Sequence, residues 1–252
     1  YAAATGGDPR TRQMAIRWLD DQSRLNRALT PDQEKWLLTR IENGGHPDWD
    51  IEYKLWLFNS AFNNLQRSTD IERYTRLLQN LATEHPHRRM QLYALQHIGL
   101  LRENGRLTGP LAEEIHRDLE KLIDQPGHPV AGTAIALLID WTDDEPPADT
   151  IEHALKLAAD PAVPVDVRVT SLHAADHAAL GLARELSGDT DQPIILRKAA
   201  IASLGRYGDR SDTAALEQFA AEHFRLAQAA EPALKAIDHR HTNPTPPDLT
   251  PF

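Results

Sequence analysis

The apolar positions of this chain repeat with the spacing of amphipathic α-helices along most of its length. Segment 196–207 is the clearest case, because its apolar residues fall on one stripe of a helix of 3.6 residues per turn. These residues are Leu196, Ala199, Ala200, Leu204 and Tyr207. We expect Leu204 to be buried between adjacent helix pairs, together with Leu196, the two alanines and Leu234.

Helix start signals precede the amphipathic segments. Asp8-Pro9 and the capping box of Thr30 and Gln33 predict helices over about 10–28 and 31–43. Farther along, prolines precede helical segments at intervals of about 30 to 45 residues, which is typical of an array of helix pairs. These are Pro47, Pro86, Pro129, Pro161 and Pro193. We expect them in first helical turns, where the missing N–H has no intrahelical partner.

The second half of the chain contains an internal repeat. Segment 164–168 aligns without gaps over 193–197, and Leu226, Ala229 and Ala230 align over Leu196, Ala199 and Ala200. Gly205 and Gly208-Asp209 are expected to end the helix that begins near residue 196, because glycine commonly follows a helix C-terminus. A second helix is expected from about Asp212 to Glu222.

Segment 196–209 resembles the HEAT-repeat family. Its sequence LRKAAIASLGRYGD is similar to the pattern V-R-x-x-A-A-x-A-L-G-x-I-G-D of HEAT-like repeats. The similarity is fair for 164–177 and 223–237, weak for 47–142 and absent for 1–44. The resemblance implies an all-α fold, a right-handed α-solenoid or superhelix of stacked antiparallel helix pairs, with one helix of each pair lining a concave face. It implies no specific activity, since family members are mostly scaffolds.

Three regions are predicted along the chain. Residues 1–44 form an N-terminal helical cap, 45–238 the HEAT-like helical repeats, and 239–252 a Pro-rich extended tail. Four of the five tryptophans fall in the first quarter, where they either seal the end of the core or form a patch for a partner. The tail is expected to dock through Leu249 and Phe252, on this chain or on a second copy.

Composition narrows the functional classes. The net charge is −10, and no cluster of basic residues accompanies it, so nucleic acid is not expected as a partner. Arginine outnumbers lysine, which we interpret as genomic bias.

There is no cysteine, which excludes disulfides and thiolate chemistry. No apolar run is long enough to span a membrane. The missing cysteines and the start at Tyr1 favour an exported protein, periplasmic or extracellular, although a trimmed chain would also begin without Met.

Few residues of the sequence are candidates for a metal site or a catalytic site. His173 and His177 have the i, i+4 spacing at which two helical histidines could chelate zinc, but both fall off the apolar stripe, which favours a solvated face and no metal. His46, His85 and His128 each precede a proline that opens a helical segment, which indicates a role in turns. The acidic run Asp143-Asp144-Glu145 is interpreted as a polar loop. We expect no catalytic residue, no cofactor and no metal.

These observations predict a non-enzymatic interaction scaffold that binds a protein or peptide partner. One alternative is a structural subunit of a larger assembly, including a homo-oligomer. Another is an enzyme of HEAT fold, since a few HEAT-like proteins act on DNA bases or bilin pigments. The acidic charge argues against the first of these substrates, and the absence of cysteine against covalent pigment attachment.

Overall fold

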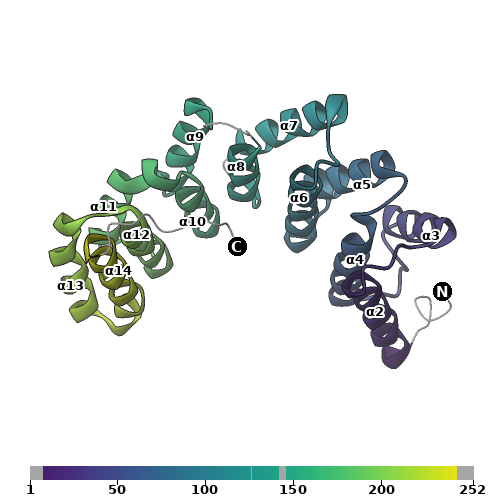
Figure 1. Cartoon of the computed structure of the whole chain (residues 1–252), viewed down its shortest axis with the longest axis horizontal. Coiled ribbons are helices and arrows are strands. Elements are labelled where there is room, and N and C mark those ends of the chain that lie inside the picture. The colour runs from purple at the N-terminus through teal and green to yellow at the C-terminus, as the bar shows by residue number, and fades with distance from the viewer. Residues whose placement is uncertain (1–7, 126, 142–145, 243–252) are drawn as a thin grey trace. The chain divides into compact units, whose positions relative to one another are not determined.

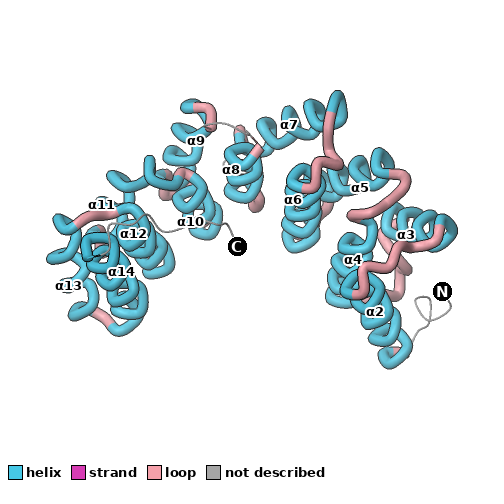
Figure 2. Tube along the Cα trace, in the orientation of Figure 1, coloured by secondary structure: helices cyan, strands magenta, loops and turns pink. Residues whose placement is uncertain are grey.

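The computed structural model describes residues 8–125, 127–141 and 146–242, and this part of the chain is all-α (Figures 1 and 2). It contains 13 α-helices, which pack mostly with their sequence neighbours. Two compact units divide at Asp118/Leu119, inside helix α7. The expected boundary at 44/45 falls within the first of these units, and the distinction between an N-terminal cap and helical repeats stays a prediction.

The first unit contains five helices and most of a sixth, α7, whose last residues belong to the second unit. They are α2 (Pro9–Arg24), α3 (Pro31–Glu42), α4 (Ile51–Leu65), α5 (Ile71–Glu84), α6 (Arg88–Glu103) and α7 (Gly109–Ile123). α5 packs on α6, and α4 packs on both α2 and α6. α2 and α4 run in the same direction, because Arg12 pairs with Asp50 at their starts and Asn64 bonds the carbonyl of Leu19 nearer their ends.

The second unit continues with seven α-helices and two short 3₁₀-helices. They are α8 (Ala131–Asp140), α9 (Ala148–Ala159), α10 (Val165–Ala174), η1 (Asp176–Ala179), α11 (Leu180–Gly188), α12 (Ile194–Tyr207), η2 (Arg210–Asp212), α13 (Thr213–Glu222) and α14 (Phe224–Thr242). Consecutive helices pair as α9 with α10, α11 with α12, and α13 with α14. Next-but-one helices also pack, in the succession α8, α10, α12 and α14.

The predicted helix starts are largely confirmed. Asp8 accepts hydrogen bonds from the N–H groups of Arg10 and Thr11, and Thr30 forms the expected capping box with Gln33. α2 ends at Arg24, earlier than expected, and Asn26 has a left-handed φ of 54° that is incompatible with a continuing helix. The five recurring prolines do precede helices, but they lie before the first helical residue and not in the first turn.

The buried stripe of α12 is confirmed at its centre and corrected at its edges. Leu196, Ala200 and Leu204 are at most 1% exposed, whereas Tyr207 is half-buried. Leu234 was expected in this core, but it is also half-buried. α14 instead buries the stripe Leu226, Ala230, Ala233 and Ile237. Successive residues of this stripe are four, three and four positions apart, which is the spacing that keeps one side of a helix against its neighbour.

Gly205 does not end its helix, contrary to the prediction. α12 continues to Tyr207, and a Cβ atom at position 205 would lie 2.7 Å from the Cα of Ala233. This glycine therefore permits the close approach of α12 and α14. Gly208 does follow the helix, as expected, but its φ is −71° and not left-handed.

The last helix also differs from its expected end. α14 runs to Thr242, so residues 239–242 are helical and not part of an extended tail. The predicted tail residues 243–252, with Leu249 and Phe252, lie outside the described part of the chain, as does the acidic loop 143–145.

Candidate functional site

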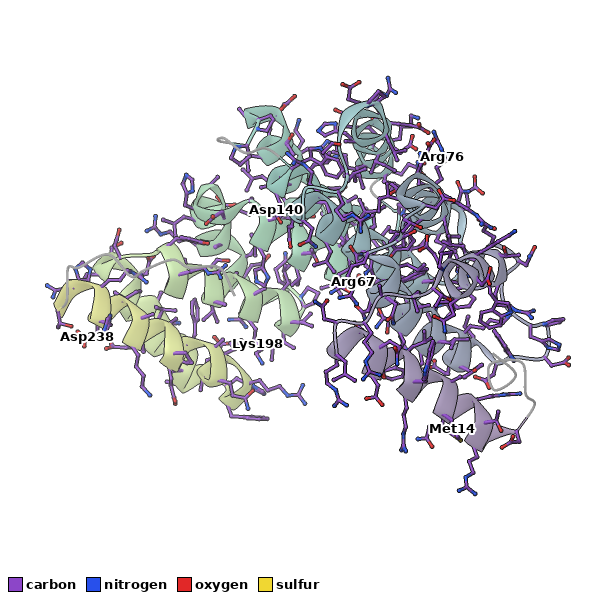
Figure 3. All side chains as sticks on the ribbon, turned by 45° about the vertical axis from the view of Figure 1, so that its right-hand side comes forward. Met14, Arg67, Arg76, Asp140, Lys198 and Asp238 are labelled. Atoms are coloured by element: carbon purple, nitrogen blue, oxygen red, sulfur yellow. The ribbon has the colours of Figure 1, made fainter. Side chains whose placement is uncertain are left out.

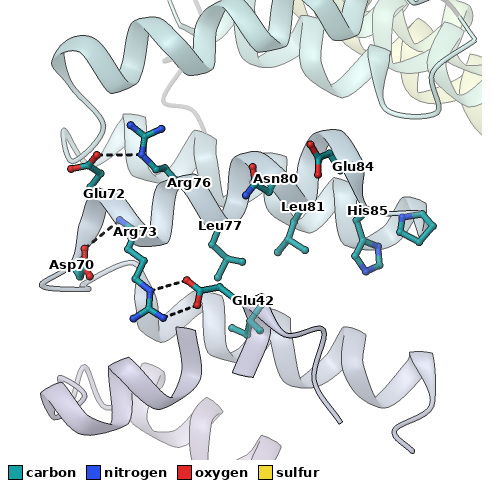
Figure 4. A pocket seen from close by; sticks show the side chains of 12 residues that line it. Glu42, Asp70, Glu72, Arg73, Arg76, Leu77, Asn80, Leu81, Glu84 and His85 are labelled. Carbon is teal, nitrogen blue, oxygen red and sulfur yellow. Dashed lines mark hydrogen bonds and ion pairs between the residues drawn. The ribbon is translucent and has the colours of Figure 1, made fainter. Parts of the chain in front are cut away.

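An open groove follows one side of α5 in the first unit, and we name it the α5 groove (Figure 4). Its volume is about 690 Å³. Twelve residues from α3, from α5 and from the segments flanking α5 line it: Ile41, Glu42, Asp70, Glu72, Arg73, Arg76, Leu77, Asn80, Leu81, Glu84, His85 and Pro86. Leu77 and Leu81 lie on the side of α5 that faces Glu42, whereas Asn80 and Glu84 lie toward its other edge.

The start of α5 is fixed by a buried carboxylate of α3. Glu34 is 5% exposed and accepts hydrogen bonds from the Ser68 hydroxyl at 2.5 Å and from the backbone N–H groups of Thr69 and Asp70 at 3.1 and 3.0 Å. Burial raises the pKa of Glu34, but these hydrogen bonds outweigh it and lower the pKa below its ordinary value. Asp70, placed in this way, caps α5 by accepting from the N–H of Arg73.

Two arginines of the α5 groove are held by carboxylates. Arg73 makes a bidentate contact with Glu42, at 2.7 Å from Nε and 2.6 Å from Nη2. Arg76 bonds Glu72 and Glu114, each at 3.2 Å. The hydrogen bonds to these carboxylates raise the pKa of both arginines. Their guanidinium charges are therefore largely neutralised within the groove itself.

Four further arginines bond backbone carbonyls near the C-terminal ends of helices, and we call them the arginine caps. Arg168 donates from Nε to the carbonyl of Ala158 at 2.9 Å, and Arg197 donates in the same way to Ser187 at 3.0 Å. In both cases the carbonyl lies ten residues before the arginine. The last carbonyls of a helix lack intrahelical partners and carry partial negative charge, so a guanidinium satisfies them well.

The other two arginine caps act across longer stretches of sequence. Arg106 donates to the carbonyls of Gln66 and Ser68, both at 2.6 Å, just beyond the end of α4. Arg240 donates to the carbonyls of Gly205 and Gly208 at 2.7 and 2.8 Å, at the end of α12. Four arginines of this chain therefore have a structural role, which an interpretation of the arginine content as genomic bias does not include.

The candidate zinc pair does not share a helix. α10 ends at Ala174, so His173 lies in its last turn, whereas His177 lies in the 3₁₀-helix η1. Asp176 between them has a φ of 52°, which breaks the i, i+4 geometry. Both imidazoles are exposed. Within the described residues, no group of three or more His, Asp or Glu side chains is arranged to hold a metal ion.

Two of the three turn histidines act as predicted. The Nδ1 atoms of His46 and His85 accept hydrogen bonds from the backbone N–H groups two residues later, at 3.2 and 3.0 Å. His128 makes no such bond, and its buried Nδ1 has no hydrogen-bond partner among the described residues. His223 makes the same contact to the N–H of Arg225, although no proline follows it to signal the turn.

The tryptophans of the first unit divide between core and surface. Trp49 is 4% exposed and contacts Tyr53 edge-on, whereas Trp36 is half-buried. Trp56 and Trp18 are 58% and 42% exposed. Trp49 therefore belongs to the core, whereas Trp18 and Trp56 lie on the surface.

No helix in the described residues has the length and apolar character needed to cross a membrane. No model of a known family matches the chain. Comparison with curated proteins and with solved structures gives no match either.

Proposed function

We propose that this chain is a protein-interaction scaffold built from HEAT-like helix pairs stacked as an α-solenoid. Support comes from the packing of next-but-one helices within each unit, as expected when similar helix pairs follow one another. The corresponding bonds of Arg168 and Arg197 also support it, because two successive segments use the same residue for the same contact. An array of this kind leaves extended surfaces for partners.

The α5 groove is the observation on which the scaffold proposal rests. It is open along a helix, as the binding sites of peptide segments often are, and its arginines are already paired with carboxylates. A catalytic site would instead bring titratable groups together with strongly shifted pKa values around a substrate position. The strongest pKa changes, at His97 and Tyr74, belong to the buried interior and not to the α5 groove.

Capture from the source cells at native expression levels tests the proposal. The tagged full chain is isolated at low and moderate salt, its partners are identified by mass spectrometry, and the free chain is measured by light scattering. A scaffold should yield a reproducible partner together with a pool of free chain. Recovery of the chain alone under every condition would contradict the proposal.

A structural subunit of a larger assembly is the second candidate, favoured by exposed apolar side chains. Met14 and Trp18 of α2 are 59% and 42% exposed, and their spacing of four residues places them on one side of the helix (Met14 is labelled in Figure 3). Leu25, the residue after α2, is 53% exposed. Exposed apolar stripes are typical of interaction surfaces. A structural subunit would be found entirely within one large complex, with no pool of free chain.

A further inference from the structure

We infer that the α5 groove binds an extended basic segment of a partner protein, about six residues long, with an aliphatic residue among its cationic ones. The inference rests on the proposed scaffold function and specifies the chemistry of the partner. α5 has 14 residues and is therefore about 21 Å long. An extended chain advances about 3.3 Å per residue, so about six residues span the groove.

The apolar part of the α5 groove is a narrow strip. Ile41, Leu77 and Leu81 are 2%, 6% and 9% exposed, so most of their surface is already covered by the protein. The strip therefore provides contact for one aliphatic side chain at most. A partner helix that buries a wide apolar face needs much more exposed apolar surface than this.

Charge decides which segments the groove accepts. Its lining contains four carboxylates, Glu42, Asp70, Glu72 and Glu84, against the guanidinium groups of Arg73 and Arg76. Burial lowers the pKa of His85, so this imidazole is neutral at pH 7. Glu114 lies just outside the lining and shares Arg76 with Glu72. The groove is therefore net negative, which favours lysine and arginine side chains and repels phosphates and acidic peptides.

Glu84 provides a sharp test, because it is exposed and is the last residue of α5. Its replacement by lysine reverses a charge of the lining without disturbing a buried contact. A cation is also favourable at a helix C-terminus, so the variant should retain its fold. Glu185→Lys is the matched control, because Glu185 is exposed on α11 and does not line the α5 groove.

The experiment uses a random peptide library displayed on phage, selected on the immobilised full chain. Synthetic versions of the enriched peptides are then titrated against the wild-type chain and both variants by fluorescence anisotropy. We expect enriched peptides with net positive charge and at least one Leu, Ile or Val. Glu84→Lys should weaken their affinity by roughly tenfold, with Glu185→Lys unchanged, and added salt should weaken binding to the wild-type chain. A second variant, Asn80→Trp, should reduce affinity by filling the exposed part of the groove.

Three results would overturn the inference. Enriched peptides that are acidic, or that bind both charge variants equally, would mean that a different surface selects them, and the scaffold proposal would remain. Failure to enrich any peptide would also reject the basic-segment inference. The scaffold proposal is judged separately, by whether the chain captures a partner in its source cells.

Discussion

At the scale of single residues, His97 is a buried histidine that the sequence pattern does not single out. It is 3% exposed on α6, and its Nδ1 lies 2.8 Å from the amide nitrogen of Gln66, next to the ring of Phe62. Burial lowers the pKa of His97 to about 4, compared with 6.5 for an ordinary histidine. Between about pH 4 and pH 6.5, this imidazole is therefore neutral in the folded chain and protonated in the unfolded chain.

Stability should consequently fall as the pH is lowered from about 6.5 to about 4. In this window the unfolded state binds a proton at His97 and the folded state does not, so the free energy of unfolding drops by up to about 3 kcal/mol. His97→Gln should flatten this part of the profile, measured by urea unfolding at several pH values. The exposed His177→Gln is the control and should retain the wild-type slope. Identical slopes for all three proteins would show that His97 is not the responsible group.

Gly205 allows a second test at the residue scale. Alanine normally favours a helix interior over glycine by about 1 kcal/mol, but a Cβ atom here would lie 2.7 Å from both the Cα and the Cβ of Ala233. We expect Gly205→Ala to lower the free energy of unfolding by roughly 1–3 kcal/mol, because α12 and α14 must move apart. Gly181→Ala, on α11 with no atom within 4 Å, should be neutral or stabilising. A stabilised Gly205→Ala protein in denaturant melts would refute the close-approach explanation.

These residues show where sequence reasoning is effective and where it stops. The periodic stripe correctly placed Leu196, Ala200 and Leu204 in the core, because burial follows directly from helical spacing. The purpose of Gly205 could not be predicted, since it depends on Ala233, 28 positions later, approaching from another helix. The environment of His97 likewise depends on Phe62 of α4 and on Gln66 just after that helix, which sequence periodicity does not connect to it.

At the scale of elements, three of the four arginine caps join one helix to the end of another, whereas Arg106 acts from the segment between α6 and α7. Arg168 is 3% exposed and satisfies the carbonyls of Ala158 and Ala159, at the end of α9, and the side chain of Gln192. Burial lowers the pKa of Arg168, but a guanidinium remains charged at neutral pH. This side chain therefore fixes the turn between α9 and α10 at a point where backbone groups would otherwise lack partners.

Removal of this contact should destabilise the second unit. Arg168→Met keeps much of the side-chain volume but leaves carbonyls at the end of α9 without donors, and we expect a loss of roughly 1–3 kcal/mol in the free energy of unfolding. Chemical denaturation followed by circular dichroism measures it. The control is Arg210→Met, because Arg210 is exposed in η2. Equal stability of Arg168→Met and the wild-type chain would show that the cap contributes nothing.

Helix starts were easier to predict than helix ends. Thr30 and Gln33 form a capping box within four residues of sequence, so local pattern is enough to identify it. α10 ends before Asp176 adopts a left-handed φ, at a place with no glycine or proline to mark it. The sequence alone therefore predicts a shared helix face for His173 and His177, which this break removes.

At the scale of the whole molecule, the proline intervals and the segment alignment predicted an all-α chain of successive helices. The division at Asp118/Leu119 was not predicted, because it falls inside α7 and no change in composition marks it. The α5 groove was also missed, since its lining comes from α3, α5 and the flanking segments. One local sign was available, namely two acidic residues followed by two basic residues at the start of α5: Asp70, Glu72, Arg73 and Arg76.

The central claim is that this chain binds a partner protein through the α5 groove, and photo-crosslinking in the source cells tests it most directly. A photoreactive amino acid is placed at Asn80, which is exposed in the groove, and separately at Glu185 as a control. The scaffold account predicts a discrete crosslinked product from position 80, lost when Glu84→Lys is added and absent from position 185, with the attachment mapped to a basic segment of one protein. No product from position 80, or the same products from both positions, would contradict the account.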